Sequence, residues 1–389
     1  MKMKKMISLM LALLLLVGVL AGCGNHEEPA ADNNKTTTSD TTTDNTEKDT
    51  TPDKVPPETR VIVDIAGREI EIPNTVETCV TLGSAARLVT YAGGADKIIG
   101  LSDLEKQGDP GMPYCYVNND LFTSCTSVAS GGSGNTVYDE ALAMLDMDVI
   151  FYQTTDLETL DGLQNKIGVP VIAVYARNFY DADFYASLEL IGEVLGTEDH
   201  AKTVIDAVKG WTEDLNNRTK DIPDEDKPTV YTGALGFSGA HGFEGTSANF
   251  PPFVAVNAKN VVDETGEKGT MLIDLEKVTA WDPNYLFLNP NSMYIVNDDY
   301  KVNASFYDNL TAVKEGRVYT MISYNYFATN QELAILDAYF VGCTIYPEAF
   351  ADLDFNAKAE EIFNVMLGSD YFDVLEENGS GFGTVVIGE

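Results

Sequence analysis

Residues 197–221 read TEDHAKTVIDAVKGWTEDLNNRTKD, and this stretch predicts how the rest of the chain is organised. Its apolar residues recur at steps of three and four positions, the spacing of one face of a helix. They are Ala201, Val204, Ile205, Val208, Trp211 and Leu215. Thr197 suits the N-cap position, and Pro223 cannot continue a helix. We therefore predict one long connecting helix over residues 197–222.

Similar sequence units lie on both sides of this helix. Residues 137–153, VYDEALAMLDMDVIFYQ, combine an amphipathic helix with a buried strand, and residues 272–290, LIDLEKVTAWDPNYLFLNP, have the same order. The repetition predicts two similar lobes, an N-terminal lobe over residues 59–196 and a C-terminal lobe over residues 223–389, joined by the helix.

Strand-like and helix-like segments alternate within each predicted lobe. VIVDIAGREIEIP (61–73) predicts a hairpin, and TCVTLGS (78–84) predicts a strand that leads into a helix. QELAILDAYFVGCTIYPEAF (331–350) predicts a closing helix whose apolar residues are core. This alternation is typical of mostly parallel sheets with helices on both faces. We therefore predict an α/β protein of two Rossmann-like lobes, with a ligand crevice beyond the carboxyl ends of the strands.

The N-terminal segment has the features of a secretory signal. Lysines 2, 4 and 5 precede an apolar run over residues 7–20, which is too short for a comfortable membrane span. The run ends in Leu-Ala-Gly-Cys, which resembles a bacterial lipobox, so residues 1–22 are predicted to be a lipoprotein signal peptide and Cys23 the lipid-modified N-terminus. Residues 23–58 are rich in Thr, Asp and Asn without an apolar cluster, and we predict a disordered tether.

The composition is strongly acidic, with 61 Asp and Glu against 25 Lys and Arg and a formal net charge of −36. This charge argues against a nucleic-acid partner, because phosphate is bound mainly by cations. It also requires an anionic ligand to be held by local cations or amide dipoles. The cysteines show no zinc-site spacing, and Cys115 and Cys125 could either form a disulfide or stay reduced.

Signals for enzymatic chemistry are weak. The segment GFSGA (236–240) lacks the second glycine of a nucleophile elbow, and neither a P-loop nor a G-x-G-x-x-G motif is present. The chain has only three histidines, His26, His200 and His241, too few for a metal centre built from several imidazoles. We predict binding and release without catalysis, with a secreted hydrolase or a structural surface protein as distant alternatives.

Six residues are candidates for ligand contact: Arg87, Arg177, His241, Tyr294, Tyr324 and Tyr326. The arginines and the histidine lie near a helix start, after a strand and between loop glycines, where charge and free amides can meet an anion. The tyrosines could line an amphipathic pocket. The alternatives are a surface ion pair for Arg87, a capped loop residue for His241 and packing between the lobes for the tyrosines.

Four segments together carry a family resemblance: GREIEIPNTVETCVTLGSAARLVTYAGGADKIIGLS (67–102), LELIGEVLGTEDHAK (188–202), LEKVTAWDPNYLFL (275–288) and AVKEGRVYTM (312–321). In this order they resemble the substrate-binding lipoproteins of ABC importers for iron complexes, haem and cobalamin, the class with a rigid connecting helix. The resemblance covers essentially the whole body after the tether. Residues 239–242, 251–253 and 324–330 are similar to a branch that includes molybdate and tungstate binders.

The resemblance implies a cargo and partners. The cargo would be a metal complex such as a ferric siderophore, haem or a corrinoid, with molybdate or tungstate as the alternative, and no cofactor is expected. The partners would be an ABC permease and its ATPase subunits, and Glu140 and Glu276 would dock the two lobes on the permease. Both glutamates also suit a helix first turn for its dipole alone. The protein would be a monomer, lipid-anchored on the extracytoplasmic face of the bacterial cell membrane.

Overall fold

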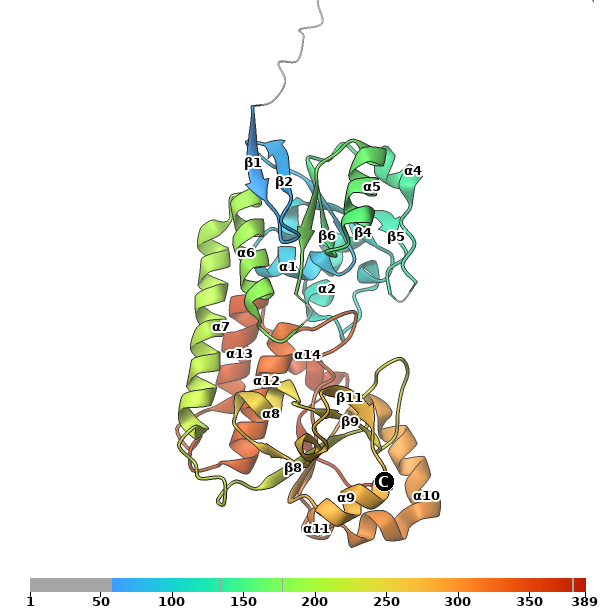
Figure 1. Cartoon of the computed structure of the whole chain (residues 1–389), viewed down its shortest axis with the longest axis vertical. Coiled ribbons are helices and arrows are strands. Elements are labelled where there is room, and N and C mark those ends of the chain that lie inside the picture. Colours follow the sequence, from blue (N-terminus) through green and yellow to red (C-terminus); the bar gives the residue numbers. More distant parts are fainter. Residues whose placement is uncertain (1–57, 133, 177, 380) are drawn as a thin grey trace, which may run out of the picture. The chain divides into compact units, whose positions relative to one another are not determined.

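A five-stranded parallel sheet organises the first half of the folded body in the computed structural model, which describes residues 58–389 without Ser133, Arg177 and Ser380 (Figure 1). The strand order is β5-β4-β3-β6-β7. These strands are β3 (Cys79–Leu82), β4 (Ile98–Ser102), β5 (Thr126–Ala129), β6 (Val149–Gln153) and β7 (Val171–Val174). β3 and β7 are buried over their whole length, as expected of strands covered on both faces.

Helices connect these strands, and α6 (Ala182–Leu195) follows the last of them. The other α-helices are α1 (Ala85–Tyr91), α2 (Pro113–Val117), α3 (Asn119–Ser124), α4 (Asp139–Ala143) and α5 (Leu157–Ile167), and the 3-10 helices are η1 (Ala95–Lys97) and η2 (Glu105–Gln107). Cys115 and Cys125, for which a disulfide was an open alternative, are buried free thiols on either side of α3.

The second sheet has the order β10-β8-β12-β13-β14 and is parallel except for the last strand. Its strands are β8 (Thr229–Gly233), β10 (Lys259–Asn260), β12 (Tyr285–Leu288), β13 (Val318–Thr320) and β14 (Gly383–Thr384). Its helices are α8 (Pro251–Ala255), η3 (Val261–Thr265), α9 (Leu275–Trp281), η4 (Pro290–Ser292), α10 (Met293–Asn309) and α11 (Thr311–Lys314).

Two small antiparallel sheets of two strands each stand beside the larger sheets. The predicted hairpin at the start of the body is β1 (Thr59–Val63) with β2 (Glu69–Pro73), and Gly67 takes a left-handed φ of 79° in its turn. A second antiparallel pair is formed by β9 (Gly245–Ala248) and β11 (Gly269–Leu272), with α8, β10 and η3 between them in the chain. Ser247 of β9 and Thr270 of β11 place side chains beside the carboxyl ends of the second sheet.

The long helix predicted from the opening stretch is α7 (Glu198–Thr219). The six apolar residues that predicted it are all buried, together with Thr219. Thr197 occupies the N-cap position, but its side chain makes no capping hydrogen bond. Gly210 does not interrupt the helix. The predicted α/β fold class with two Rossmann-like units and one long helix is therefore confirmed.

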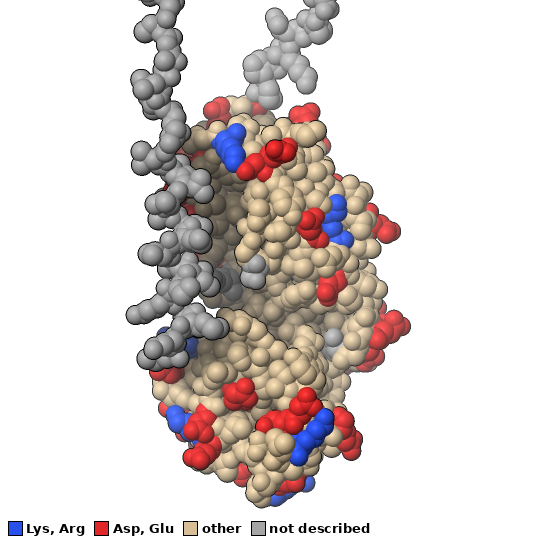
Figure 2. All heavy atoms as spheres, turned by 90° about the vertical axis from the view of Figure 1, so that its right-hand side faces the viewer, with Lys and Arg blue, Asp and Glu red and all other residues tan. Residues whose placement is uncertain are grey.

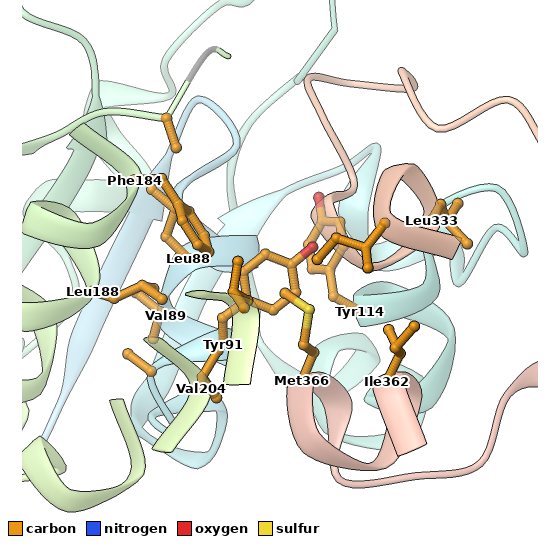
Figure 3. Close-up of a cluster of buried hydrophobic side chains, with 14 of the residues drawn as sticks. Leu88, Val89, Tyr91, Tyr114, Phe184, Leu188, Val204, Leu333, Ile362 and Met366 are labelled. Carbon is orange, nitrogen blue, oxygen red and sulfur yellow. The ribbon is translucent and has the colours of Figure 1, made fainter. Parts of the chain in front are cut away.

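One hydrophobic core runs through both units because the C-terminal helices pack against the first. These helices are α12 (Gln331–Ile345), α13 (Phe355–Leu367) and α14 (Phe372–Glu377), and α13 contacts α1, α2 and α7. Figure 3 shows Tyr91 of α1 and Val204 of α7 in one cluster with Leu333 of α12 and Met366 of α13. Close packing of so many buried side chains favours a fixed arrangement of these elements. None of the described helices has the length and apolar character needed to cross a bilayer.

Candidate functional site

The strand order of the first sheet reverses between β3 and β6, and a pocket opens at that point. In open α/β sheets the chain leaves the carboxyl ends of such strands in opposite directions, which leaves a crevice. Ser84 follows β3 and Gln153 ends β6, and the Ser84 hydroxyl donates to the Gln153 Oε1 at 2.7 Å. The pocket has a volume of about 650 Å³. We call it the N-pocket; it is lined by Gly83, Ser84, Gly132, Gln153, Thr154, Thr155, Asp156, Tyr175, Phe327 and Ala328.

The second sheet has the same feature between β8 and β12. Leu235 follows β8, and Asn289 follows β12. The Asn289 amide donates to the Ser323 Oγ at 3.2 Å, and its Oδ1 accepts from the Asn291 backbone N–H at 3.0 Å. The pocket has a volume of about 50 Å³. We call it the C-pocket; it is lined by Leu235, Gly236, Ser247, Phe250, Thr270, Asn289, Met321, Ile322, Ser323, Tyr324 and Asn325.

Residues 324–330, which we call the cleft loop, contribute to both pockets. Tyr324 and Asn325 line the C-pocket, whereas Phe327 and Ala328 line the N-pocket. An antiparallel bridge joins Asn325 to Thr329 and closes a tight turn between them. The loop therefore brings part of the second unit to the switch point of the first.

Arg87 holds this loop. Its side chain is 2% exposed, its Nε donates to the Asn330 Oδ1 at 3.0 Å, and its Nη2 donates to the Tyr326 carbonyl at 3.0 Å. The guanidinium also lies over the Tyr114 ring, 4.6 Å from the centroid. All of these contacts are to protein groups, and two of them join α1 to the cleft loop.

Further hydrogen bonds fix the two units to each other around this point. The Asn330 amide donates to the Gly111 carbonyl at 3.2 Å and to the Tyr324 carbonyl at 3.1 Å. The Tyr371 hydroxyl donates to the Pro110 carbonyl at 2.7 Å. Asn330 is itself fully buried, so its two bonds are formed away from water.

Buried carboxyl groups lie close to the same contact. Burial raises the pKa of Glu105 to about 6, against the hydrogen bonds that it accepts from Ser102 and Tyr114 and the attraction of Arg87. Burial also raises the pKa of Glu332, whose carboxylate accepts a hydrogen bond from the Tyr91 hydroxyl. The Arg87 cation thus lies among neutral groups and buried carboxyl groups whose pKa values are raised.

The described walls of both pockets are almost free of charge. No Asp, Glu, Lys, Arg or His is among the described residues of the C-pocket, and Asp156 in the N-pocket accepts from the Thr159 N–H as the N-cap of α5. Figure 2 shows charged side chains in separate clusters over the body with uncharged atoms between them. Within residues 58–389 as described, no group of three or more His, Cys, Asp or Glu could hold a metal ion.

The arrangement favours binding by neutral groups. Hydroxyls and amides supply hydrogen bonds, and aromatic rings supply apolar surface. Burial raises the pKa of the Tyr324 hydroxyl, which keeps it a neutral donor, and its ring lies beside Phe179 and Phe250. No described nucleophile in these pockets is paired with a base.

The six predicted ligand residues are placed differently. Tyr324 lines the C-pocket, and Tyr326 lies in the cleft loop with its hydroxyl 3.4 Å from the Asp109 Oδ2. Tyr294 begins α10, is 61% exposed and lines neither pocket. Arg177 lies outside the described residues. Ligand contact by these residues stays a prediction.

His241 lies in the loop between β8 and β9, as expected. Its ring packs on Phe237 at 4.2 Å, and its Nε2 is 2.9 Å from the Phe237 carbonyl. The His241 ring therefore faces its own loop, and the residue lines neither described pocket.

Sequence reasoning did not select Ser84, Gln153, Asn289 and Ser323, although they lie at the centres of the two pockets. The available signal was position: each follows or ends a predicted strand. Selecting them requires the strand order, because only the two strands at a reversal open the crevice.

The two predicted docking residues occupy equivalent positions. Glu140 lies in the first turn of α4, which precedes β6, and Glu276 lies in the first turn of α9, which precedes β12. Both side chains are exposed. Docking by Glu140 and Glu276 stays a prediction, as does lipid attachment at Cys23, which lies outside the described residues.

The fold and the paired switch-point pockets define a two-lobed ligand-binding protein. A family model described as "Periplasmic binding protein" matches residues 99–324. The chain therefore belongs to the periplasmic binding protein family, and the superfamily recognised from the sequence, that of ABC-transporter substrate-binding proteins, is confirmed.

Relatives of known name agree with this assignment. The molybdate-binding protein MolA of Haemophilus influenzae is 21% identical over 80% of this chain and 92% of its own length, and its molybdate-bound structure has a TM-score of 0.62. The uncharacterised ABC transporter substrate-binding lipoprotein YvrC of Bacillus subtilis is 26% identical over 82% of this chain and 90% of its own. A periplasmic solute-binding protein of Veillonella parvula is 18% identical over 83% and 96%, with a TM-score of 0.67.

Proposed function

We propose that this chain is the extracytoplasmic substrate-binding component of an ABC importer and that its cargo is a metal oxyanion of the molybdate or tungstate class. The observation that carries the choice of cargo is the C-pocket, whose described walls offer hydroxyls and amides without a charged side chain. The similarity to MolA over most of both chains supports the same choice.

The chemistry of the walls argues for an oxygen-rich anion. A bare metal cation needs carboxylates, thiolates or imidazoles, and the described C-pocket has none of these. An oxyanion offers only acceptors, so it needs donors, which Ser247, Thr270 and Ser323 can supply. Neutral donors also leave the empty pocket without an unpaired charge, which would be costly to bury.

A metal chelate is the second candidate, favoured by the size of the N-pocket. At about 650 Å³ it lies within the range of small-molecule sites. A ferric siderophore, haem or a corrinoid would place its apolar parts against Tyr175.

The remaining parts of the function concern attachment and delivery. In this proposal Cys23 carries the lipid that holds the protein on the membrane. Glu140 and Glu276 then contact the permease, one from each unit. Their exposed, equivalent positions in the first turns of α4 and α9 support that role.

Calorimetric titration of the full-length protein in detergent tests the cargo. Molybdate and tungstate should bind with saturable heat, whereas ferric siderophore, haem and cobalamin should not. Asn289→Ala should weaken molybdate binding by about tenfold, because it removes a hydrogen-bond donor from the C-pocket wall. Asn364→Ala, on an exposed position of α13, is the matched control. Saturable binding of a chelate instead of either oxyanion would establish the second candidate.

A further inference from the structure

We propose that the cleft loop, residues 324–330, is a partition that limits the size of the cargo. This inference rests on the proposed function, since it explains how a small oxyanion would be selected over a chelate. The loop separates two pockets that lie at the two switch points, and consecutive parts of it line opposite sides. Without its tip, the space of the two pockets would join.

The base of the loop is anchored from the first unit. Arg87 donates to the Tyr326 carbonyl and to the Asn330 side chain, both at 3.0 Å. Asn330 in turn donates to the Tyr324 carbonyl at 3.1 Å. The first residue of the loop, its middle and its end are thus all tied to one buried arginine.

The tip of the loop, Phe327 and Ala328, has a strained backbone. Phe327 has φ of 49° and Ala328 has φ of 72°, so two successive residues with side chains take the left-handed conformation. A tight turn with two such residues strongly favours Asn-Gly, because Gly has no Cβ and the short polar side chain of Asn tolerates the left-handed conformation. Among the described residues, the backbones of Phe327 and Ala328 form no hydrogen bond. Strain of this kind persists where the surrounding structure requires it and is concentrated at ligand sites.

The Phe327 ring is the reason to keep Phe-Ala at the tip in spite of the backbone strain. Asn-Gly would relieve the backbone but would remove the ring, which lines the N-pocket and packs partly buried against the core. The ring therefore occupies space that a larger cargo would need. The ring excludes a neutral or apolar chelate, which the uncharged walls of the pockets would otherwise bind.

The test replaces the tip with the turn that the backbone prefers. Phe327→Asn with Ala328→Gly keeps the fold of the loop and removes the ring. Ala328→Gly alone relieves strain and keeps the ring, so it is the matched control. Full-length wild type and both variants are titrated in detergent with sodium molybdate and with ferrichrome, a neutral ferric hydroxamate. Thermal melting of each variant shows that it is folded.

We expect the double variant to bind ferrichrome at least about tenfold more tightly than the wild type, with molybdate affinity changed by less than about threefold. Ala328→Gly should melt higher than the wild type and still exclude ferrichrome.

If the folded double variant excludes ferrichrome while the wild type binds molybdate, the partition is wrong and the proposed cargo stands. If the wild type binds ferrichrome as tightly as the double variant, the partition is wrong and the oxyanion proposal fails with it. If only the double variant binds ferrichrome and neither protein binds molybdate, the partition stands and the proposed cargo fails. If neither protein binds either ligand, both proposals are overturned.

Discussion

Replacing Asn330 with alanine should lower the free energy of unfolding by about 4 kcal/mol, the sum of one lost hydrogen bond to a buried cation and two to buried carbonyls. Asn330 is fully buried and accepts from the Arg87 Nε at 3.0 Å. It donates to the Gly111 and Tyr324 carbonyls at 3.2 and 3.1 Å. Alanine leaves the Arg87 Nε, which is charged, and the Gly111 carbonyl without this partner, whereas the Tyr324 carbonyl keeps the hydrogen bond that it accepts from the backbone N–H of residue 330 at 2.8 Å.

Urea denaturation followed by intrinsic fluorescence measures this change. With a slope of about 3 kcal/mol per M, the midpoint should fall by about 1.3 M. Asn364→Ala, whose amide makes only a local bond to the Glu360 carbonyl, should change the free energy of unfolding by less than about 0.5 kcal/mol.

Asn330→Asp separates the two contributions. The carboxylate keeps an acceptor for Arg87 but cannot donate to the Gly111 and Tyr324 carbonyls. It should therefore be less stable than the wild type despite its better charge match. A midpoint for Asn330→Ala within 0.3 M of the wild type, an order-of-magnitude bound well below the expected shift, would refute the assignment of Asn330 as the link between the two units.

Three further predictions follow from buried and exposed charge and from α7. Burial raises the pKa of Glu105 to about 6, so the unfolded chain releases this proton at a lower pH than the folded protein does. The free energy of unfolding should therefore fall by about 2 kcal/mol as pH rises from 4.5 to 6. Melting curves measured across that range should show this fall for the wild type and not for Glu105→Gln. Glu140→Lys with Glu276→Lys should keep cargo affinity and abolish cargo-dependent stimulation of the reconstituted importer's ATPase, whereas Glu158→Lys, an exposed first-turn control, should keep both cargo affinity and stimulation. Solution scattering should show little change in radius of gyration on cargo binding, because α7 continues through Gly210; a large change would contradict a rigid helix.

The long helix could be predicted because its signal is local. The spacing of Ala201 to Leu215 alone defined the buried face of α7, and every one of those residues is buried. Alternation of strands and helices likewise predicted parallel sheets. The side-chain cap at Thr197 did not form, since N-cap chemistry depends on one rotamer that spacing does not determine.

The contacts of Arg87 could not be predicted in the same way. Its position near the start of a helix after β3 was visible, but its partners Tyr326 and Asn330 lie about 240 positions later in the chain. Whether such a side chain faces a ligand, solvent or another element is decided by how α12 and α13 pack on α1. That packing is a property of the whole core and has no local pattern.

The excess of acid explains why the described pocket walls are neutral. Where an arginine lies within reach of a carboxylate in so acidic a chain, the two form an ion pair: Arg60 with Glu193, Arg68 with Asp64 and Asp161, Arg218 with Asp214 and Asp352, and Arg317 with Glu315. Of the described arginines, only Arg87 has no carboxylate within ion-pairing distance, and it is fully buried against protein groups. A cation left in the cleft would recruit a carboxylate and so cancel its own attraction for an anion. Hydroxyl, amide and backbone donors are not cancelled in this way, which makes them the groups by which a strongly acidic protein can bind an anion.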